Sequence, residues 1–592
     1  MSTTDADLVI VGATPAGITT AIAAARLSKT SIIVERTPFI GGLPANGLGA
    51  TDIATRGATG GLFLEFVARI KAHYVAQYGP DSPQVRDCDD GYHFEPSVAE
   101  AIFHQWLREF PHITILRERQ FDFEPENVAK QGDRITSIRV TNLATGQPET
   151  ITGRFFVDCT YEGDLIAAAG VPFFLGREGR EVYGEMGAGR VYKLWNGHEC
   201  AGSTGAGDNA VQAYNYRLCM TCDAANRAPV RRPARYHREE FASLVHDVKS
   251  GLHTGVWPPV SDEQVEENLR RAERNLRPEP DKLGGIRRLL SSVALPNGKV
   301  DGNNQHNAFI STDLPEENWP YPTSGWAWRD RFARRLREYT EGLLYFAQND
   351  GELPAWFRDE CSAWGWAADE YVENGHFPRQ IYVREGRRMR GKYIFTANDV
   401  CGVRPPGHVG DGGAAAGPGG GAAGSGSGGK EKNNGTAAAA AAERPRVHRT
   451  SITASHYALD SHAVRRREPG RAHLEGFFSY NCAPYSVPYG VMVPDAALEN
   501  LLAPVPVSAT HVGFSTLRME PAWMALGQAA GTAAALCLED GVPAEGVDVE
   551  RLQGLLLDQG AVLVYDARLW ADGVGVEERK AMQLEMLARS AE

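Results

Sequence analysis

The sequence has no surplus of positive charge and no long apolar run. Its 61 lysine and arginine residues are outnumbered by 74 aspartate and glutamate residues, and the formal net charge is -13. Because nucleic acids and anionic membranes both attract basic surfaces, this balance argues against either as a partner. No apolar run approaches the roughly 18 residues of a membrane-spanning helix. We therefore expect the partner to be a small molecule and neither a nucleic acid nor a membrane. This composition is compatible with an oligomer.

The sequence also lacks the cysteine pattern of a disulfide framework or a zinc site. Its nine cysteines are odd in number and scattered, which favours a reducing compartment. Cys219 and Cys222 form a CxxC pair, but no second pair or paired histidine motif accompanies it. We expect a structural role for this pair and no metal. The N-terminus MSTTDADLVIVG shows no basic region and the C-terminus ARSAE no peroxisomal signal, so the expected location is cytoplasmic.

Residues 405–446 differ in composition from the rest of the chain. This stretch is dominated by glycine, alanine and serine, which bury too little apolar area to offset the entropy lost on ordering. We predict a disordered surface loop inserted into a folded domain.

Residues 7–36 show the most regular pattern. DLVIV (7–11) is typical of a buried strand, GATPAG (12–17) of a tight turn, and the following small residues of a helix that leads to a second strand, SIIVE. ITSIRV and ETITGRFFVDCT alternate like strands. FEPSVAEAIFHQWLREF predicts a helix with a capping box of Ser97 and Glu100. Pro521 opens a further predicted helix that ends at Gly541.

The turn between the first strand and helix matches a dinucleotide fingerprint. Gly12 allows the tight turn and Gly17 a close helix–strand approach, while Thr14 replaces the usual middle glycine. A pyrophosphate would lie at the helix N-terminus, where unpaired N–H groups favour anions. Glu35 ends the second strand, where an acidic residue binds the adenosine ribose. The alternative is a glycine-rich turn without a ligand.

The segment after Glu35 separates FAD from NAD. Arg36 is followed by TPFI and then by Gly41 and Gly42, an arrangement that NAD dehydrogenases do not use. Here the chain closely resembles the FAD-dependent oxidoreductases of the glutathione-reductase-like superfamily, within them the family whose members begin with GGTPAG. In that group threonine at position 14 is usual. The resemblance continues through GLGATD, GGLFLEF, HFEPSVAEAIF, DCTYEGDLIAAAGVPF, VQAYNYRLCMT and SATHVGFSTLRMEPAWMALGQAAGTAAA.

This resemblance implies an α/β fold, with a Rossmann-type FAD-binding domain built on a parallel sheet and an inserted α+β substrate or cap domain. The implied domains are 1–175 for FAD, 176–480 for the cap with its insert, 481–545 for a segment returning to the FAD domain, and 546–592 for a helical tail. The expected cofactor is FAD. The expected cofactor-binding residues are Gly12, Thr14, Pro15, Ala16, Gly17, Glu35, Arg36, Gly41, Gly42, Gly163, Asp164, Gly527 and Gly531.

The predicted helix that begins near Pro521 has a physical reason to lie at the flavin. A helix N-terminus near Pro521 would direct partial positive charge at the flavin and stabilise its anionic reduced form. Gly527 and Gly531 would let the helix pack closely on its neighbours. The alternative is a small-residue helix that is buried for packing alone.

A single dinucleotide fingerprint argues against flavoenzymes that bind NAD(P)H in a second Rossmann domain. We expect hydride transfer from a small organic substrate to the flavin, with His511 as base and Arg518 as the anion-stabilising group. Asp52 and Tyr485 are further candidates. Alternatively, His511 bonds only the backbone and Arg518 pairs with a carboxylate. Other functional readings are a non-catalytic FAD sensor or assembly protein, and a lyase-like enzyme.

The cap segment is rich in arginine. The arginines at 384, 387, 388 and 390 are candidates for binding a carboxylate substrate, but the sequence favours a solvated helix face for them.

Overall fold

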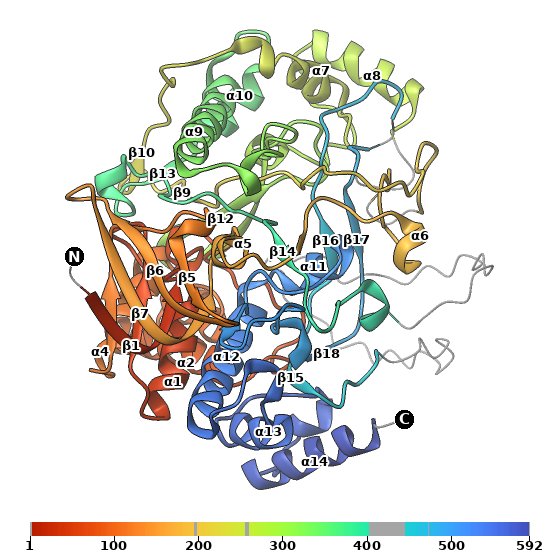
Figure 1. Ribbon diagram of the computed structural model, residues 1–592. Coiled ribbons are helices and arrows are strands. Elements are labelled where there is room, and N and C mark those ends of the chain that lie inside the picture. The colour runs from red at the N-terminus through yellow and green to blue at the C-terminus, as the bar shows by residue number, and fades with distance from the viewer. Residues whose placement is uncertain (1–2, 195–197, 255–259, 402–444, 472, 591–592) are drawn as a thin grey trace.

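The computed structural model describes residues 3–194, 198–254, 260–401, 445–471 and 473–590 (Figure 1). The predicted disordered loop at 405–446 lies outside the described residues, except for its last two.

The N-terminal part is organised around an eight-stranded sheet with the order β3-β2-β1-β7-β6-β4, in which β19 also pairs with β7 and β5 with β6. Strand β1 (Thr3–Val11), helix α1 (Pro15–Arg26) and strand β2 (Ser31–Val34) form the predicted βαβ unit. β1 runs parallel to β2 and to β7 (Gln147–Asp158), and β2 runs parallel to β3 (Ile113–Leu116). The expected α/β fold with a parallel-containing sheet is therefore confirmed.

The apolar run of β1 faces a core on both sides of the sheet. Leu8 and Ile10 belong to the main hydrophobic core, whereas Val9 and Val11 belong to a second core. Successive side chains of a strand alternate between faces, so a strand that is covered on both faces needs a continuous apolar sequence. This explains why DLVIV shows no alternation.

The strands at the edge of the sheet beyond β7 pair in antiparallel fashion. They are β4 (Arg119–Gln120), β5 (Val128–Gln131) and β6 (Arg134–Asn142), and β6 pairs with the first half of β7. Helices α2 (Leu62–Tyr78), α3 (Pro83–Asp87), α4 (Pro96–Arg108) and α5 (Asp164–Ala168) belong to the same part of the chain.

The predicted capping box at α4 is wrong. The helix begins at Pro96, and Glu95 is the N-cap residue without a side-chain cap. Ser97 Oγ instead donates to Glu370 Oε1 at 2.8 Å, and Glu100 pairs with Arg379. Proline fixes the first helical position, so both side chains serve long-range contacts.

The C-terminal segment returns to this sheet. β19 (Leu501–Leu502) pairs in parallel with β7, and α12 (Glu520–Asp540) lies beside α1 (Figure 1). Helix α12 ends at Gly541, whose φ of +69° is the left-handed conformation expected of a glycine cap. α11 (His511–Leu517) precedes it, and α13 (Val549–Asp558) and α14 (Val576–Arg589) follow.

The central segment carries a second, antiparallel sheet with the order β10-β13-β9-β12-β11. Its strands are β9 (Leu218–Thr221), β10 (Arg227–Ala228), β11 (Leu290–Leu295), β12 (Lys299–Asn304) and β13 (Gly365–Ala367). The helices are α6 (Arg180–Tyr183), α7 (Ser243–Ser250), α8 (Asp262–Glu273), α9 (Trp326–Asn349) and α10 (Ala355–Ser362).

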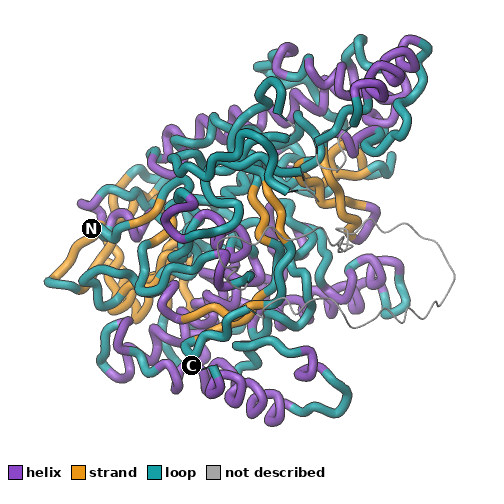
Figure 2. Tube along the Cα trace, turned by 90° about the vertical axis from the view of Figure 1, so that its right-hand side faces the viewer, coloured by secondary structure: helices purple, strands orange, loops and turns teal. Residues whose placement is uncertain are grey.

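Three two-stranded sheets complete the fold, and Figure 2 shows how much of the remaining chain runs as loops. They pair β8 (Phe173–Phe174) with β14 (Arg388–Met389), β15 (Ser451–Ser455) with β18 (Tyr485–Pro488), and β16 (Leu459–Ser461) with β17 (Phe478–Tyr480). Among the described residues, no helix is both long and apolar enough to cross a membrane.

Candidate functional site

The glycine turn between β1 and α1 has the geometry that its sequence predicts. Gly12 has a φ of +102°, which favours glycine. A Cβ at Gly17 would lie 2.0 Å from the carbonyl oxygen of Gly12, so no side chain fits there. Thr14 caps α1, since its Oγ1 accepts from Gly17 N at 3.3 Å and donates to the Cys159 carbonyl at 2.9 Å. The threonine thus anchors the turn to the end of β7.

Glu35 lies beside this turn, directly after β2. Its Oε2 accepts from Ala13 N at 3.0 Å, and its Oε1 accepts from the backbone N and Oγ1 of Thr37 at 2.8 and 2.9 Å. Burial raises the pKa of Glu35, although these donors lower it. Each carboxylate oxygen has two lone pairs, so this fixed group retains acceptor capacity for a further hydroxyl.

A pocket extends from the glycine turn towards the start of α9. The predicted cofactor residues that line it are Gly12, Thr14, Glu35, Arg36, Gly42 and Asp164. On the opposite wall, the Arg36 guanidinium lies 4.2 Å from the ring centre of Trp326 and pairs with Asp330 at 2.7 Å. Helix α9, which belongs to the predicted cap segment, therefore lines the same pocket as Glu35 and Arg36.

The other predicted cofactor residues do not line the pocket. They are Pro15, Ala16, Gly17, Gly41, Gly163, Gly527 and Gly531. A Cβ at Gly527 would lie 2.3 Å from the Ala16 carbonyl oxygen, and one at Gly531 would lie 2.1 Å from that of Thr20. These two glycines therefore provide the close approach of α12 to α1.

Asp164 is committed to protein contacts. Its carboxylate accepts from Arg329 at 2.6 and 2.8 Å and from Arg387 at 2.8 Å. Burial alone would raise the pKa of Asp164, but the two arginines outweigh it and lower the pKa. Asp164 thus ties the end of the FAD-type sheet to α9.

The sequence did not single out Tyr161 and Glu520, which form a buried pair at the inner end of the pocket. Tyr161 lines the pocket. Its OH donates to Glu520 Oε1 at 2.5 Å, and the hydroxyl oxygen of Tyr161 accepts from Leu43 N at 3.2 Å. Burial raises the pKa of Glu520 to about 8. Its Oε2 has no hydrogen-bond partner among the described residues. An acidic residue just before Pro521 was a readable signal, because helix N-termini favour acidic residues.

Two of the predicted reacting residues, Asp52 and Arg518, lie in one buried charge network. Asp52 lies 3.8 Å from Arg217, and Arg518 bonds Tyr382 OH at 2.8 Å and the Asp460 carbonyl at 2.8 Å. Burial raises the pKa of Asp52, and the positive charges of Arg217 and Arg518 counteract this increase. Arg518 also pairs with the Asp460 carboxylate at 3.4 Å.

His511, at the start of α11, is held at both ring nitrogens. Its Nδ1 lies 2.8 Å from Glu385 Oε2 and its Nε2 lies 3.1 Å from Ser461 Oγ. Burial would raise the pKa of Glu385, but His511 and Arg388 lower it overall. His511 therefore uses side-chain partners rather than only the backbone.

Tyr485 lies apart from this network. Its OH contacts Thr516 Oγ1 at 2.8 Å and donates to the Thr516 carbonyl at 3.2 Å. The structure thus places Asp52 and Arg518 within electrostatic range of each other. It connects His511 to Arg518 through Ser461 and Asp460, adjacent residues of β16, and leaves Tyr485 outside.

The comparison with known proteins decides the family. A family model described as FAD dependent oxidoreductase matches residues 7–556. The chain belongs to this family. FAD is therefore its cofactor, and the predicted family is confirmed. No curated protein matches the chain by sequence.

Several solved structures are similar to part of the chain. The chain is similar to p-nitrophenol 4-monooxygenase PnpA from Pseudomonas putida DLL-E4, with 13% identity over 30% of this chain and 44% of that chain and a TM-score of 0.19. It is also similar to L-proline dehydrogenase from P.horikoshii (14% identity, 27% and 23% covered, TM-score 0.17). A third is OxyS anhydrotetracycline hydroxylase from Streptomyces rimosus (15% identity, 30% and 36% covered, TM-score 0.21). The chain spans less than half the length of these three proteins.

The residues of the pocket fit FAD. The α1 N-terminus and the Glu35 carboxylate are the anion-binding and hydroxyl-binding groups that a dinucleotide needs. At Gly42 a Cβ would lie 2.3 Å from Tyr161 OH and 2.8 Å from Pro15 Cδ, so this wall is narrow and glycine is required. The unpartnered Glu520 Oε2 supplies a buried polar atom close to the pocket's inner end.

The expectation of a solvated helix face for the cap arginines is wrong. Arg384, Arg387 and Arg388 are at most 2% exposed and pair with Asp313, Asp164 and Glu178 respectively, while Arg390 is exposed. They lie on β14 and neighbouring loops rather than on a helix. A buried guanidinium requires a carboxylate partner, so these side chains are committed to the protein.

Cys219 and Cys222 are free thiols in different environments. Cys219 is buried on β9 against Ala367 and Tyr371, and Cys222 is exposed. Burial raises the pKa of the Cys219 thiol, which makes it less reactive. No group of three or more potential metal ligands occurs among the described residues.

Proposed function

We propose that this FAD-dependent oxidoreductase is a dehydrogenase or oxidase that removes a hydride from a small organic substrate. The observation that supports this proposal is the buried acid–base network at the inner end of the FAD pocket. Tyr161 lines that end and donates to Glu520, and the charge of Asp52 contributes to the raised pKa of Glu520. Asp52 in turn belongs to the network of Arg518. Titratable groups with shifted pKa values beside a cofactor pocket are typical of a reacting centre.

When bound, FAD supplies the hydride-accepting group. Loss of a hydride from a carbon that carries a hydroxyl or amine also requires a base for the O–H or N–H proton. We assign this role to His511. Glu385 holds the Nδ1 proton, so Nε2 is left as the basic nitrogen, which lies beside Ser461 Oγ.

Arg518 supplies positive charge in the same network. It is fully buried and only partly neutralised, since the nearest carboxylate oxygen of Asp460 lies 3.4 Å away. Burial raises the pKa of Asp460, so its carboxylate is harder to ionise. A buried guanidinium with a weakened counter-ion favours negative charge that develops nearby during the reaction.

The proposal is tested with purified protein. The absorption spectrum and the nucleotide released on denaturation should identify FAD. In an anaerobic screen of alcohols and amines, at least one compound should bleach the flavin band at about 450 nm. Bound FAD that no compound reduces would refute the proposal and favour a sensor or assembly role. Product analysis without net oxidation would favour a lyase-like reaction.

A further inference from the structure

A second cavity of about 200 Å³ lies in the central part of the chain, apart from the FAD pocket. It is formed by the loop at 305–315, the end of β12, the start of α7, Tyr339 of α9 and the segments at 462–467 and 473–477. Three of its lining residues are histidines, His306, His462 and His473.

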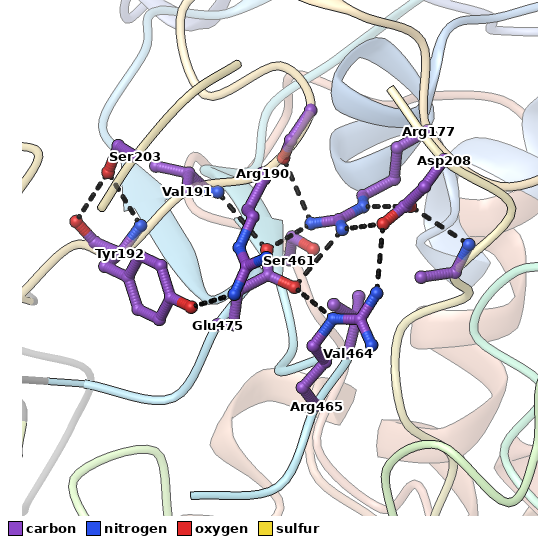
Figure 3. A network of polar contacts seen from close by, with 12 residues as sticks. Arg177, Arg190, Val191, Tyr192, Ser203, Asp208, Ser461, Val464, Arg465 and Glu475 are labelled. Atoms are coloured by element: carbon purple, nitrogen blue, oxygen red, sulfur yellow. Dashed lines mark hydrogen bonds and ion pairs between the residues drawn. The ribbon is translucent and has the colours of Figure 1, made fainter. Parts of the chain in front are cut away.

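Buried ion pairs hold two walls of this cavity. On one side, Asp313 accepts from Arg384 at 2.8 Å and lies 2.9 Å from His462 Nδ1. On the other side, Glu475 stands between lining residues of the 473–477 segment. Glu475 pairs with Arg177 at 2.6 Å and with Arg465 at 3.2 Å, and both contacts are drawn in Figure 3.

Asp208 extends the ion-pair cluster around Glu475, because Asp208 also pairs with Arg177 at 2.6 Å (Figure 3). The side chains of Arg177 and Glu475 are at most 1% exposed. Breaking one partner of such a buried pair is costly, so these walls are fixed in advance of any ligand.

Each charged residue that lines the cavity is paired with an oppositely charged side chain of the protein. The pairs are Asp313 with Arg384, Glu240 with Arg335, Arg466 with Glu317, and Arg467 with Asp247. A charged ligand would have to give up its hydration without finding an uncompensated opposite charge, which is unfavourable.

The remaining polar lining consists of groups that both donate and accept hydrogen bonds. Burial lowers the pKa values of His306 and His473 to about 4 and about 3, so both imidazoles are neutral at pH 7. His473 is only 1% exposed, and its Nδ1 contacts the Leu474 carbonyl oxygen at 3.3 Å. Asn304, Gln305 and hydroxyl side chains add further groups of this kind.

Aromatic faces lie beside these polar groups. His473 stacks on Phe477 with ring centres 4.3 Å apart, and His306 lies 4.9 Å from His462. Hydroxyl groups match neutral imidazoles and amides because each can donate and accept, while the aromatic rings match the C–H surface of the same molecule.

The cavity is connected to the predicted reacting centre. His462 lines the cavity, and its Nε2 lies 3.7 Å from Asp460 Oδ2. The same Asp460 oxygen lies 3.4 Å from Arg518. His462 thus stands between the cavity and the charge network described above.

We propose that this cavity is the substrate chamber, and that the substrate is a neutral, hydroxyl-bearing small molecule rather than a carboxylate or phosphate. The inference rests on the proposed function, because a substrate chamber implies a hydride donor for the flavin.

The test measures binding without electron transfer. Ligand-observed saturation-transfer NMR on the FAD-loaded protein would compare benzyl alcohol with benzoate and D-glucose with D-glucuronate, two pairs in which the second member carries a carboxylate on the same ring. We expect at least one neutral compound to bind saturably and at least about ten-fold more tightly than its carboxylate partner, a difference of about 1.4 kcal/mol.

Two variants locate the binding. Ala308 lines the cavity and is 3% exposed, so Ala308→Leu should fill it and abolish binding. His473→Phe keeps the stacking on Phe477 but removes the polar atoms, so it should weaken binding of the same compound even if Ala308→Leu does not fold. Ala144→Leu, at an exposed hairpin turn, is the matched control and should bind normally.

Absence of binding by both neutral compounds, equal or tighter binding of the carboxylates, or affinity that neither cavity variant changes would each refute the inference. By contrast, binding that Ala308→Leu abolishes, combined with a flavin that the bound compound never bleaches anaerobically, would refute the proposed function and leave the cavity as a ligand site.

Discussion

The contact between α1 and α12 makes a quantitative prediction about Gly527. A Cβ at this position would lie 2.3 Å from the Ala16 carbonyl oxygen and 2.4 Å from Thr19 Oγ1. Because the first of these atoms belongs to the backbone, the helices must separate, and overpacking of this kind costs about 1–3 kcal/mol. Separation also lengthens the bonds from Thr19 to the Met524 carbonyl (2.8 Å) and from Thr20 to the Gly527 carbonyl (3.0 Å). Each such bond is worth about 0.5–1.5 kcal/mol.

Alanine has a better helix propensity than glycine by about 1 kcal/mol, which offsets part of this loss. We therefore expect Gly527→Ala to lower the free energy of unfolding by about 3 kcal/mol. Gly554 of α13 is the matched control, since nothing lies within 4 Å of a Cβ there. Gly554→Ala should raise stability by about 0.5–1 kcal/mol.

Urea unfolding, followed by far-UV circular dichroism, measures both variants, and the flavin content of the folded fraction is recorded beside it. A Gly527→Ala protein as stable as Gly554→Ala would refute the argument that these glycines set the spacing of the two helices.

Four further outcomes follow from individual contacts. Gly17→Val should give a folded but colourless protein, because its side chain would collide with the Gly12 carbonyl, and retention of FAD would contradict this. Deleting residues 410–442 and joining the ends by a short linker should leave melting temperature and flavin content nearly unchanged, since loop entropy changes by only about 0.6 kcal/mol per doubling of length. His511→Ala should keep FAD but slow substrate reduction of the flavin about 100-fold, and an unchanged rate in stopped-flow absorbance would remove it as the base. Burial raises the pKa of Glu520 from 4.5 to about 8, so this group lowers stability progressively as pH rises between these values. Glu520→Gln keeps an acceptor for Tyr161 but cannot ionise. The melting temperature of the variant minus that of the wild type should therefore increase with pH up to about pH 8 and stay constant above it. A difference that does not change with pH would contradict the raised pKa of Glu520.

Local patterns account for what the sequence predicted well. The βαβ unit needs only one short stretch of chain, in which apolar runs, a glycine turn and small residues agree with each other. Even Thr14 has a local reason, because it caps the helix that it precedes. Gly541 likewise ends α12 through its own left-handed backbone. Such features depend on neighbours in sequence, so they can be read without the fold.

Contacts between distant segments could not be read in this way. Tyr161 and Glu520 are 359 positions apart, and Asp164 and Arg329 are 165 apart. The sequence favours a solvent-exposed position for the arginines of the predicted cap, because arginine is rarely buried without a partner. Their partners come from other parts of the chain. Only the three-dimensional structure therefore reveals that Arg384 is buried in an ion pair with Asp313, and Arg387 in one with Asp164.

The short strand β16 and the residue after it link the predicted reacting residues to the second cavity. Its residues and the one that follows have three separate partners: Asp460 pairs with Arg518, Ser461 contacts His511, and His462 faces the second cavity and Asp313. Successive side chains of an extended chain point in alternate directions, so a single short segment can contact groups on both sides of it. A substrate bound at His462 would therefore change the surroundings of Asp460 and, through it, the charge around Arg518. This coupling gives a physical reason why the raised pKa values, the buried arginines and the neutral cavity occur together in one region.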